Sequence, residues 1–313
     1  MALPNITKRK MFFAKFATFW IPVKTYRKML RGILLMGVDN YLKVLKEEKT
    51  KKFSYELSVV AIMKNEGAYL KEWLDFHILV GVEKFYLYDN ESNDDTKKIL
   101  KPYIKQGIVE YTYFPGQKRQ NPAYIDALNK HANDSRWMAF IDLDEFIVPV
   151  KHKTITDFLR TLPKNFGALV LTWVMYGSAG HKRKPKGLVI ENFKYHANEK
   201  RHSGCKSIVN PRLVVSQRNP HINDVAGFLI DENGRKLGRI DQTNNPPSYN
   251  KIRCNHYVTK SYDEYKARCN KGSASTGTKS PTKKWSREKF DRYDTNDIYD
   301  DIMDKYVKIL KSN

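Results

Sequence analysis

Three acidic residues interrupt a hydrophobic stretch near the middle of the chain. The sequence FIDLDEFIVP, residues 140–149, carries Asp142, Asp144 and Glu145 inside what otherwise reads as a buried strand. Removing a carboxylate from water is strongly unfavourable unless its charge is paired or bound to a metal. This stretch therefore predicts a site in which carboxylates meet cations.

Asp142 and Asp144 are two residues apart, so on a strand their side chains project to the same face. Two neighbouring carboxylates repel each other unless a cation lies between them or one is protonated. A hard divalent cation, held by such a pair together with substrate phosphates, is one ordinary use of the pattern. A strand end paired with lysine or arginine is the other, and an isolated Asp-x-Asp does not distinguish them.

The elements that must position these acids alternate along the chain. Runs rich in β-branched and aromatic residues predict strands at 55–63, 84–90, 108–114, 137–148 and 168–177. Amphipathic patterns predict helices at 66–81, 94–107, 123–134, 261–272 and 295–310, with Thr295 or Asn296 capping the last, and a mobile loop at 272–284. Such alternation indicates an α/β fold with a mostly parallel central sheet and helices on both faces.

Polar residues follow each of the first four predicted strands. They are Lys64, Asn65 and Glu66, then Asp89, Asn90, Ser92 and Asp94, then Gln117 and Gln120, and finally Asp142, Asp144 and Glu145. Ligands of parallel α/β sheets bind at the carboxyl ends of the strands. We therefore expect these side chains to converge on one edge of the sheet.

The first 52 residues differ in composition from the rest. The whole chain of 313 residues has a formal charge of +22, and residues 1–52 hold 13 Lys or Arg against three acids. Phe12, Phe16 and Trp20 lie among these basic residues at helical spacing. The pattern favours a segment at an anionic membrane surface, although a helix packed on the main domain with a solvated basic face would also produce it.

No apolar run of about 18 residues is present, which argues against a transmembrane helix. The N-terminus does not read as a secretory signal, because Lys15 interrupts its apolar stretch. Three cysteines are too few for a disulfide framework and favour a reducing compartment. A zinc site built from His202, Cys205, Cys254 and His256 is disfavoured, because the gap between its two halves is long.

Three blocks of the chain together resemble glycosyltransferases of the GT-A fold, in the group similar to families 2 and 92. They are AIMKNEGAYLKEWLDFHILVGVEKFYLYDNESNDDT, FIDLDEFIVP and NHYVTKSYDEYKARCNKG, in this order. The resemblance divides the chain into a basic amphipathic segment (1–52), a GT-A domain (53–272), and a loop with a C-terminal helix (273–313).

The resemblance implies a set of site residues. Those expected to contact the nucleotide sugar are Lys64, Asn65, Glu66, Asp89, Asn90, Ser92, Asp94, Gln120, Asp142, Asp144 and Lys260. Asp142 and Asp144 would hold Mn²⁺ or Mg²⁺, with His256 as a further ligand, unless His256 is simply a packed strand residue.

A general base near the acceptor hydroxyl is needed for inverting transfer. His221 and Asp224 are the candidates, and Asp231, Glu199 and His181 compete with them. Trp173, in TWVMYGSAGH, is expected to line the acceptor site.

The expected activity is metal-dependent, inverting transfer of a sugar from a nucleoside diphosphate sugar, UDP-linked by preference, to a glycan hydroxyl. Since the sequence shows no signal, no span and few cysteines, the expected setting is a cytoplasmic enzyme at the inner membrane face. It would act on a glycan or lipid-linked glycan in bacterial surface polysaccharide or lipopolysaccharide synthesis. Two alternatives are a nucleic-acid-binding protein, for which no motif is present, and a nucleotide-binding domain without catalysis.

Overall fold

The structure is a computed structural model that describes residues 3–163, 166–198, 204–221, 223–238, 248–271 and 286–312. Its helices are α1 (Lys8–Thr18), α2 (Lys24–Met36), α3 (Val38–Thr50), α4 (Gly67–Leu79), α5 (Thr96–Lys105), α6 (Gln120–His131), α7 (Ile155–Arg160), α8 (Val189–Asn192), α9 (Tyr262–Lys271), α10 (Arg287–Tyr293) and α11 (Asp304–Ser312). Its strands are β1 (Tyr55–Met63), β2 (Lys84–Asp89), β3 (Val109–Tyr113), β4 (Ser135–Phe140), β5 (Glu145–Pro149), β6 (Phe166–Met175), β7 (Tyr195–His196), β8 (Cys205–Val209), β9 (Val214–Gln217), β10 (Asn223–Val225), β11 (Phe228–Ile230), β12 (Ile252–His256) and β13 (Ile298–Tyr299).

The central sheet has the strand order β3-β2-β1-β4-β8-β6-β12-β5, and β11 pairs with β6 outside this path. Strands β3, β2, β1 and β4 are mutually parallel. Strand β8 runs antiparallel to both of its neighbours, and β5 antiparallel to β12. The predicted α/β class and mostly parallel sheet are therefore confirmed, with antiparallel strands introduced in the second half.

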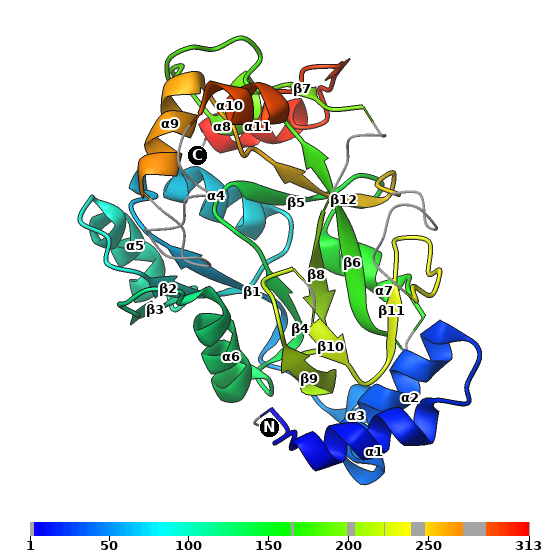
Figure 1. The fold of residues 1–313 in the computed structure, drawn as a ribbon. Coiled ribbons are helices and arrows are strands. Elements are labelled where there is room, and N and C mark those ends of the chain that lie inside the picture. Colours follow the sequence, from blue (N-terminus) through cyan, green and yellow to red (C-terminus); the bar gives the residue numbers. More distant parts are fainter. Residues whose placement is uncertain are drawn as a thin grey trace.

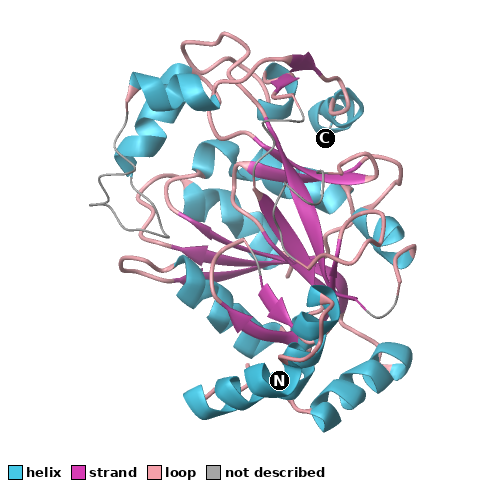
Figure 2. Ribbon diagram, turned by 45° about the vertical axis from the view of Figure 1, so that its right-hand side comes forward, coloured by secondary structure: helices cyan, strands magenta, loops and turns pink. Residues whose placement is uncertain are grey.

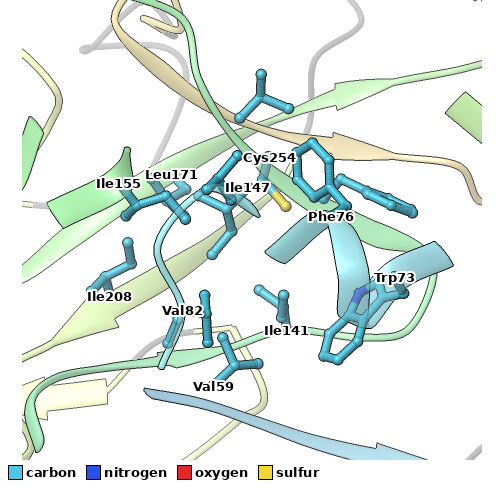
Figure 3. Close-up of a cluster of buried hydrophobic side chains, with 14 of the residues drawn as sticks. Val59, Trp73, Phe76, Val82, Ile141, Ile147, Ile155, Leu171, Ile208 and Cys254 are labelled. Atoms are coloured by element: carbon cyan, nitrogen blue, oxygen red, sulfur yellow. The ribbon is translucent and has the colours of Figure 1, made fainter. Parts of the chain in front are cut away.

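Both faces of the sheet are covered, which explains why its strands read as continuous apolar runs. Alternate residues of β1 point to opposite sides: Val59 packs in one hydrophobic cluster with Trp73 of α4, and Val60 in another with Tyr124 of α6. Figure 2 shows helices on either side of the sheet. The larger cluster joins elements distant in sequence, such as Phe76 of α4 and Cys254 of β12 (Figure 3).

The predicted fourth strand, 137–148, is wrong in one respect: it is two strands, β4 and β5, separated by four residues. The turn closes where the Glu145 N–H donates to the Asp142 carbonyl, at 3.1 Å. Asp142 and Asp144 lie in this turn, so the expectation that a strand projects both to one face is also wrong. Strand β5 ends the sheet path opposite β3, and four residues span at most about 14 Å. The sheet must therefore curl to bring β5 close to β4.

The N-terminal segment folds as three helices at one end of the molecule, whereas α8 to α11 lie at the other (Figure 1). Ile33 and Met36 of α2 and Val44 of α3 pack against Leu213 and Ala226 of the main body. In addition, Glu48 of α3 pairs with the buried Arg212. No helix in the described part of the chain is both long and apolar enough to span a membrane.

The predicted C-terminal helix, 295–310, begins later than expected, at Asp304. Asn296 caps no helix, and its side-chain oxygen accepts from the backbone of Ala179, at 2.8 Å. The residues before the helix are held extended because Ile298 pairs with β7 and Asp300 pairs with Arg253. The loop predicted at 272–284 lies outside the described residues.

Candidate functional site

The acidic turn lies beside the end of β12. In the antiparallel pairing of β5 with β12, His256 is directly opposite Glu145, and such pairs place their side chains about 5 Å apart. The Asp144 carbonyl accepts from the Tyr257 N–H, at 2.8 Å, which extends this pairing into the turn. Residues 144 and 145 thus lie beside residue 256, because β5 pairs with β12, a strand more than 100 residues later in the chain.

Asp144, Glu145 and His256 form a group with the composition of a cation site. One ligand atom from each lies within 4.8 Å of the others, and all three residues are buried. Glu145 Oε1 and both His256 ring nitrogens have no hydrogen-bond partner among the described residues. Buried polar atoms are rarely left unpaired, and a divalent cation would bind Glu145 Oε1 and one ring nitrogen of a neutral His256. Two carboxylates and an imidazole are a donor set that fits Mn²⁺.

Cations of the protein itself border this group. Asp144 Oδ2 lies 3.2 Å from Arg268 Nη2, and 3.6 Å from His256 Nε2. Burial raises the pKa of Asp144, but Arg268 and then His256 outweigh it and hold that pKa well below its usual value. Burial raises the pKa of Glu145 to about 7, despite the opposing effect of Lys206. The two adjacent carboxyls therefore titrate in different pH ranges.

Asp142 has different partners. Its Oδ1 accepts from Gln120 Nε2, at 2.7 Å, and its Oδ2 from Lys206 Nζ, at 2.9 Å. The Asp142 side chain is 32% exposed, whereas the Lys206 side chain is completely buried. Both oxygens of Asp142 are thus engaged by the protein, which distinguishes it from Asp144 and Glu145.

The loops after the first four strands are joined as expected by hydrogen bonds across the sheet edge. The Asn65 N–H donates to Ser92 Oγ, at 2.9 Å, which ties the loop after β1 to the loop after β2. Asn90 Nδ2 donates to the Phe114 carbonyl beyond β3, at 3.1 Å. Together with the bond from Gln120 to Asp142, these contacts bring the predicted polar residues onto one edge.

Several of these residues also form hydrogen bonds that stabilise the loops at this edge of the sheet. Asp89 is buried and accepts from the Ser92 N–H and from the Tyr111 hydroxyl, at 2.9 and 2.6 Å. Asp94 accepts from the Gly67 N–H at the start of α4, and from Thr96 at the start of α5. Burial raises the pKa of Asp94, but the hydrogen bonds from Thr96 and Gly67 outweigh it and lower that pKa. Asp89 and Asp94 therefore also shape the edge on which a ligand would lie.

The lysines and Glu66 lie around α4 and the loop after β12. Lys260 is buried with a backbone φ of +47°, and its Nζ lies 4.3 Å from the ring centre of Tyr69. Lys64 pairs with Glu91 at 3.6 Å on the surface. Glu66 precedes α4; burial lowers the pKa of Arg268, but Asp144, Asp142 and then Glu66 outweigh burial and raise it. Arg268 thus contacts Asp144 directly, and Lys260 is near enough for its charge to help lower the pKa of Asp144, after the larger effects of Arg268 and His256.

The two candidate bases are placed differently. The His221 ring is edge-on to Trp173, with 5.2 Å between ring centres, and Trp173 also contacts the His256 ring at 4.5 Å. Burial lowers the pKa of His221, and Lys206 lowers it further. Asp224 pairs with Arg218 and accepts from Ser216 at 2.7 Å. His221 therefore lies one ring away from the acidic group, and Asp224 is engaged within the β9–β10 hairpin.

The competing candidates are engaged elsewhere or lie outside the described residues. Asp231 pairs with Arg235, and the His181 ring contacts Phe193. Glu199 and His202 are not described. Cys205 and Cys254 are free and buried, and neither belongs to a candidate metal group among the described residues.

Three residues of the cluster are absent from the metal ligands and nucleotide-sugar contacts expected from the sequence: Glu145, Lys206 and Arg268. Lys206 lies in the mostly apolar strand sequence CKSIV. A charged residue inside an apolar run is the signal that marked the acids, so Lys206 could have been recognised in the same way. Arg268 had no comparable signal, because it lies in the polar helix YDEYKARCNK. Glu145 was visible as an acid, but its pairing with His256 depends on the β5–β12 register.

The chain is similar to known proteins over much of its length. The family model for glycosyltransferase family 92 matches residues 40–303. A glycosyltransferase family 92 protein of Arabidopsis thaliana is 25% identical over 235 residues, which cover 71% of this chain and 38% of that protein. The chain thus spans well under half the length of this relative.

Two further similarities cover a smaller part of this chain. The beta-1,4-galactosyltransferase galt-1 of Caenorhabditis elegans is 28% identical over 195 residues, covering 55% of this chain and 44% of that protein. The crystal structure of S. aureus TarS 1-349 is 17% identical, covers 50% of this chain and 48% of that chain, and has a TM-score of 0.34. At so low a TM-score, this likeness does not bear on the activity.

Proposed function

The chain belongs to glycosyltransferase family 92, and on this premise we propose that it transfers a sugar from a nucleoside diphosphate sugar to a hydroxyl of a glycan acceptor. The observation that carries the proposal is the buried group of Asp144, Glu145 and His256, which lies on the sheet edge next to two protein cations. Glycosyl transfer requires charge stabilisation where the diphosphate departs, and this edge of the sheet collects the groups that supply it.

Asp144, Glu145 and His256 would hold a divalent cation, for which Mn²⁺ is the better fit because an imidazole joins the carboxylates. When bound, such an ion neutralises the charge that develops on the leaving diphosphate. Asp142 faces Gln120 and Lys206 instead, and we assign it to the ribose side of the donor.

Arg268 and Lys260 would bind the diphosphate oxygens. The Arg268 side chain is 42% exposed and touches Asp144 with one nitrogen, so the rest of its guanidinium fork is available to a phosphate. Lys260 is held in place against Tyr69. The loop residues Lys64, Asn65 and Glu66, together with Asp89, Asn90, Ser92 and Asp94, would surround the nucleoside.

His221 would take the proton of the attacking hydroxyl in an inverting reaction. Burial keeps its imidazole neutral at pH 7 by lowering its pKa, which is the state required of a base. Trp173 lies between His221 and His256, and an aromatic face at this position suits an acceptor sugar ring.

The relative named as a beta-1,4-galactosyltransferase makes galactose the first sugar to examine, with UDP-galactose as the donor. The acceptor would be a glycan hydroxyl. A role in bacterial surface polysaccharide or lipopolysaccharide synthesis stays a prediction.

The N-terminal helices would hold the enzyme at an anionic membrane surface, at the inner face if the protein is bacterial. Phe16 and Trp20 are 63% and 77% exposed, although both are large and apolar. Lys8, Arg9 and Lys15 lie with Phe16 on α1, and Trp20 follows that helix by two residues. Exposed aromatics beside basic residues are the composition that binds the headgroup region of anionic lipids.

The test is donor turnover by the full chain with Mn²⁺ and a panel of UDP-sugars. We expect metal-dependent release of UDP, which Asp144→Asn lowers by about a hundredfold or more. Asp291→Asn, which removes an exposed carboxylate paired with Arg287, is the matched control and should retain activity. Binding of UDP without turnover of any donor would instead favour a non-catalytic nucleotide-binding role.

A further inference from the structure

A lysine lies completely buried between two of the three clustered carboxylates. Lys206 Nζ is 2.9 Å from Asp142 Oδ2 and 3.4 Å from Glu145 Oε2, and its side chain is 0% exposed. Lys206 belongs to β8, which lies between β4 and β6 in the sheet. The ammonium group is therefore fixed by a central strand and cannot leave for solvent without disturbing the sheet.

Stability alone does not account for this lysine. A buried ion pair contributes little net stability compared with well-packed apolar residues, because both charges lose their hydration. Among its neighbours along β8, Cys205 and Ile208 are buried hydrophobic residues, and Ser207 is buried and hydrogen-bonded to Asn223. The strand itself supplies no counter-charge, and the ammonium group instead meets Asp142 and Glu145, so its place among these carboxylates calls for an explanation.

The contacts of Lys206 divide the carboxylates into two sets. Asp142 is restrained at both oxygens, by Lys206 and by Gln120. Glu145 has one oxygen beside Lys206, while its Oε1 has no hydrogen-bond partner among the described residues. Asp144 has no direct contact with Lys206 and faces Arg268 and His256.

We propose that Lys206 is a positioning residue that keeps Asp142 away from the metal and turned toward the donor. The cation ligands are then limited to Asp144, Glu145 and His256. This inference rests on the proposed function, because it assumes a divalent ion at that group. Because Lys206 is held 3.4 Å from Glu145, its positive charge would weaken the binding of a divalent cation at this group, and removing that charge should strengthen it.

The experiment measures Mn²⁺ affinity of the full chain without nucleotide, by electron paramagnetic resonance titration. Lys206→Met should bind Mn²⁺ about tenfold more tightly, because a repelling charge is lost and Asp142 is free to become a ligand. Its donor turnover at saturating Mn²⁺ should nevertheless fall about tenfold or more, since Asp142 no longer faces the donor. Lys206→Arg, which keeps the charge, should retain the Mn²⁺ affinity of the wild type.

Two further variants test whether the gain depends on the Asp142 carboxylate and whether loss of a buried lysine alone changes Mn²⁺ affinity. In Lys206→Met combined with Asp142→Asn, the gain in Mn²⁺ affinity should largely disappear, because the released carboxylate is absent. Lys84→Met removes another buried lysine, whose Nζ donates to the Gly107 carbonyl. Lys84 begins β2 and thus lies at the end of that strand away from the candidate site. This variant should leave Mn²⁺ affinity unchanged.

The proposal is overturned if folded Lys206→Met binds Mn²⁺ with unchanged or weaker affinity, or if the gain persists without the Asp142 carboxylate. Lys206→Gln provides a second neutral variant. If neither neutral variant folds while Lys84→Met does, Lys206 is structural and the proposal is wrong. A wild-type chain that binds neither Mn²⁺ nor UDP refutes the proposed function itself, which is a distinguishable result.

Discussion

At the scale of single residues, Glu145 has the environment with the clearest consequence for pH dependence. Burial, in the absence of a hydrogen bond to Oε1, raises its pKa from 4.5 to about 7. The folded protein without metal therefore holds this proton more tightly than the unfolded chain. The resulting contribution to stability is complete below pH 4.5 and is lost as the pH rises through about 7.

We predict that Glu145→Gln removes this pH dependence. The free energy of unfolding of the wild type, minus that of the variant, should fall between pH 4.5 and about 7 and then level off. Urea unfolding with a chelator present measures it. The lowered pKa of Asp144 acts below pH 3.8, outside this range. A difference that does not vary with pH would contradict the assignment.

Protonation of His77 changes the free energy of unfolding in an overlapping pH range, with a sign opposite to that of Glu145. For this reason the wild-type curve alone is not informative, and the difference between the wild type and Glu145→Gln is needed. Burial lowers the pKa of His77 to about 3. Its Nδ1 lies 2.8 Å from the Trp73 carbonyl, and its Nε2 accepts from the Ile147 N–H at 3.2 Å. The neutral ring thus satisfies both partners, and its contribution to stability is lost as the pH falls below 6.5.

The choice between the two base candidates gives a second residue-scale prediction. His221→Gln should lower kcat for transfer by about a hundredfold or more, because a base typically contributes that much. Donor affinity should change little, since His221 lies across Trp173 from the cation group. Asp224→Asn should remain within a few-fold of the wild type, because Asp224 is engaged by Arg218 and Ser216. Steady-state kinetics with varied acceptor distinguishes them, and the reverse ranking would make Asp224 the base.

At the scale of elements, the docking of α2 depends on one glycine. A Cβ at Gly32 would lie 2.3 Å from the Val225 carbonyl oxygen, on β10. This close approach lets Ile33 and Met36 reach the body of the protein. Gly32 therefore serves packing, at the expense of helix propensity.

We predict that Gly32→Ala destabilises the protein, although alanine favours a helix by about 1 kcal/mol over glycine. The clash with Val225 is with backbone and cannot relax by rotating a side chain, so a net loss of about 1–3 kcal/mol is expected. Urea unfolding provides the measurement. Leu34→Ala, at a half-exposed position of the same helix, is the control and should change stability by less. A more stable Gly32→Ala variant would mean that α2 does not pack this closely.

At the scale of the whole molecule, α1 leaves an aromatic and basic surface without a protein partner in the described structure. Phe12 stacks on Phe16 at 6.5 Å, and Phe19 contacts Trp20 at 5.3 Å. The other side of the N-terminal segment is occupied, since α2 and α3 pack on the body. The structure thus shows packing on the main domain for α2 and α3, and the membrane-surface interpretation stays a prediction for α1 and the Phe19 and Trp20 that follow it.

We predict that the protein binds vesicles containing phosphatidylglycerol and that Phe16→Ser with Trp20→Ser reduces this binding about tenfold or more. Salt should weaken binding as well, because the basic residues contribute through charge. Flotation measures both effects. Tyr299→Ser, at an exposed aromatic on β13, should bind as the wild type does. Equal binding by all variants would exclude α1 as the contact.

Much of the fold and part of the candidate site could be predicted from the local pattern of residues. The alternation of buried strands with amphipathic helices over residues 55–134 sufficed for the parallel half of the sheet. The acids of FIDLDEFIVP marked the site, because charges inside an apolar run require partners. The predicted C-terminal helix begins too early in the sequence, because the contact of Asp300 with Arg253 outweighs the local helical pattern.

The partners of those acids were decided only in three dimensions. The curl of the sheet breaks the acidic stretch into a turn, the β5–β12 register sets His256 against Glu145, and β8 inserts Lys206 beside Asp142. The physical reason is that side-chain periodicity is a property of neighbouring residues, whereas strand pairing depends on packing between segments far apart in the chain. The sequence alone thus determined that buried charges exist here, and the tertiary structure determined which cation each carboxylate meets.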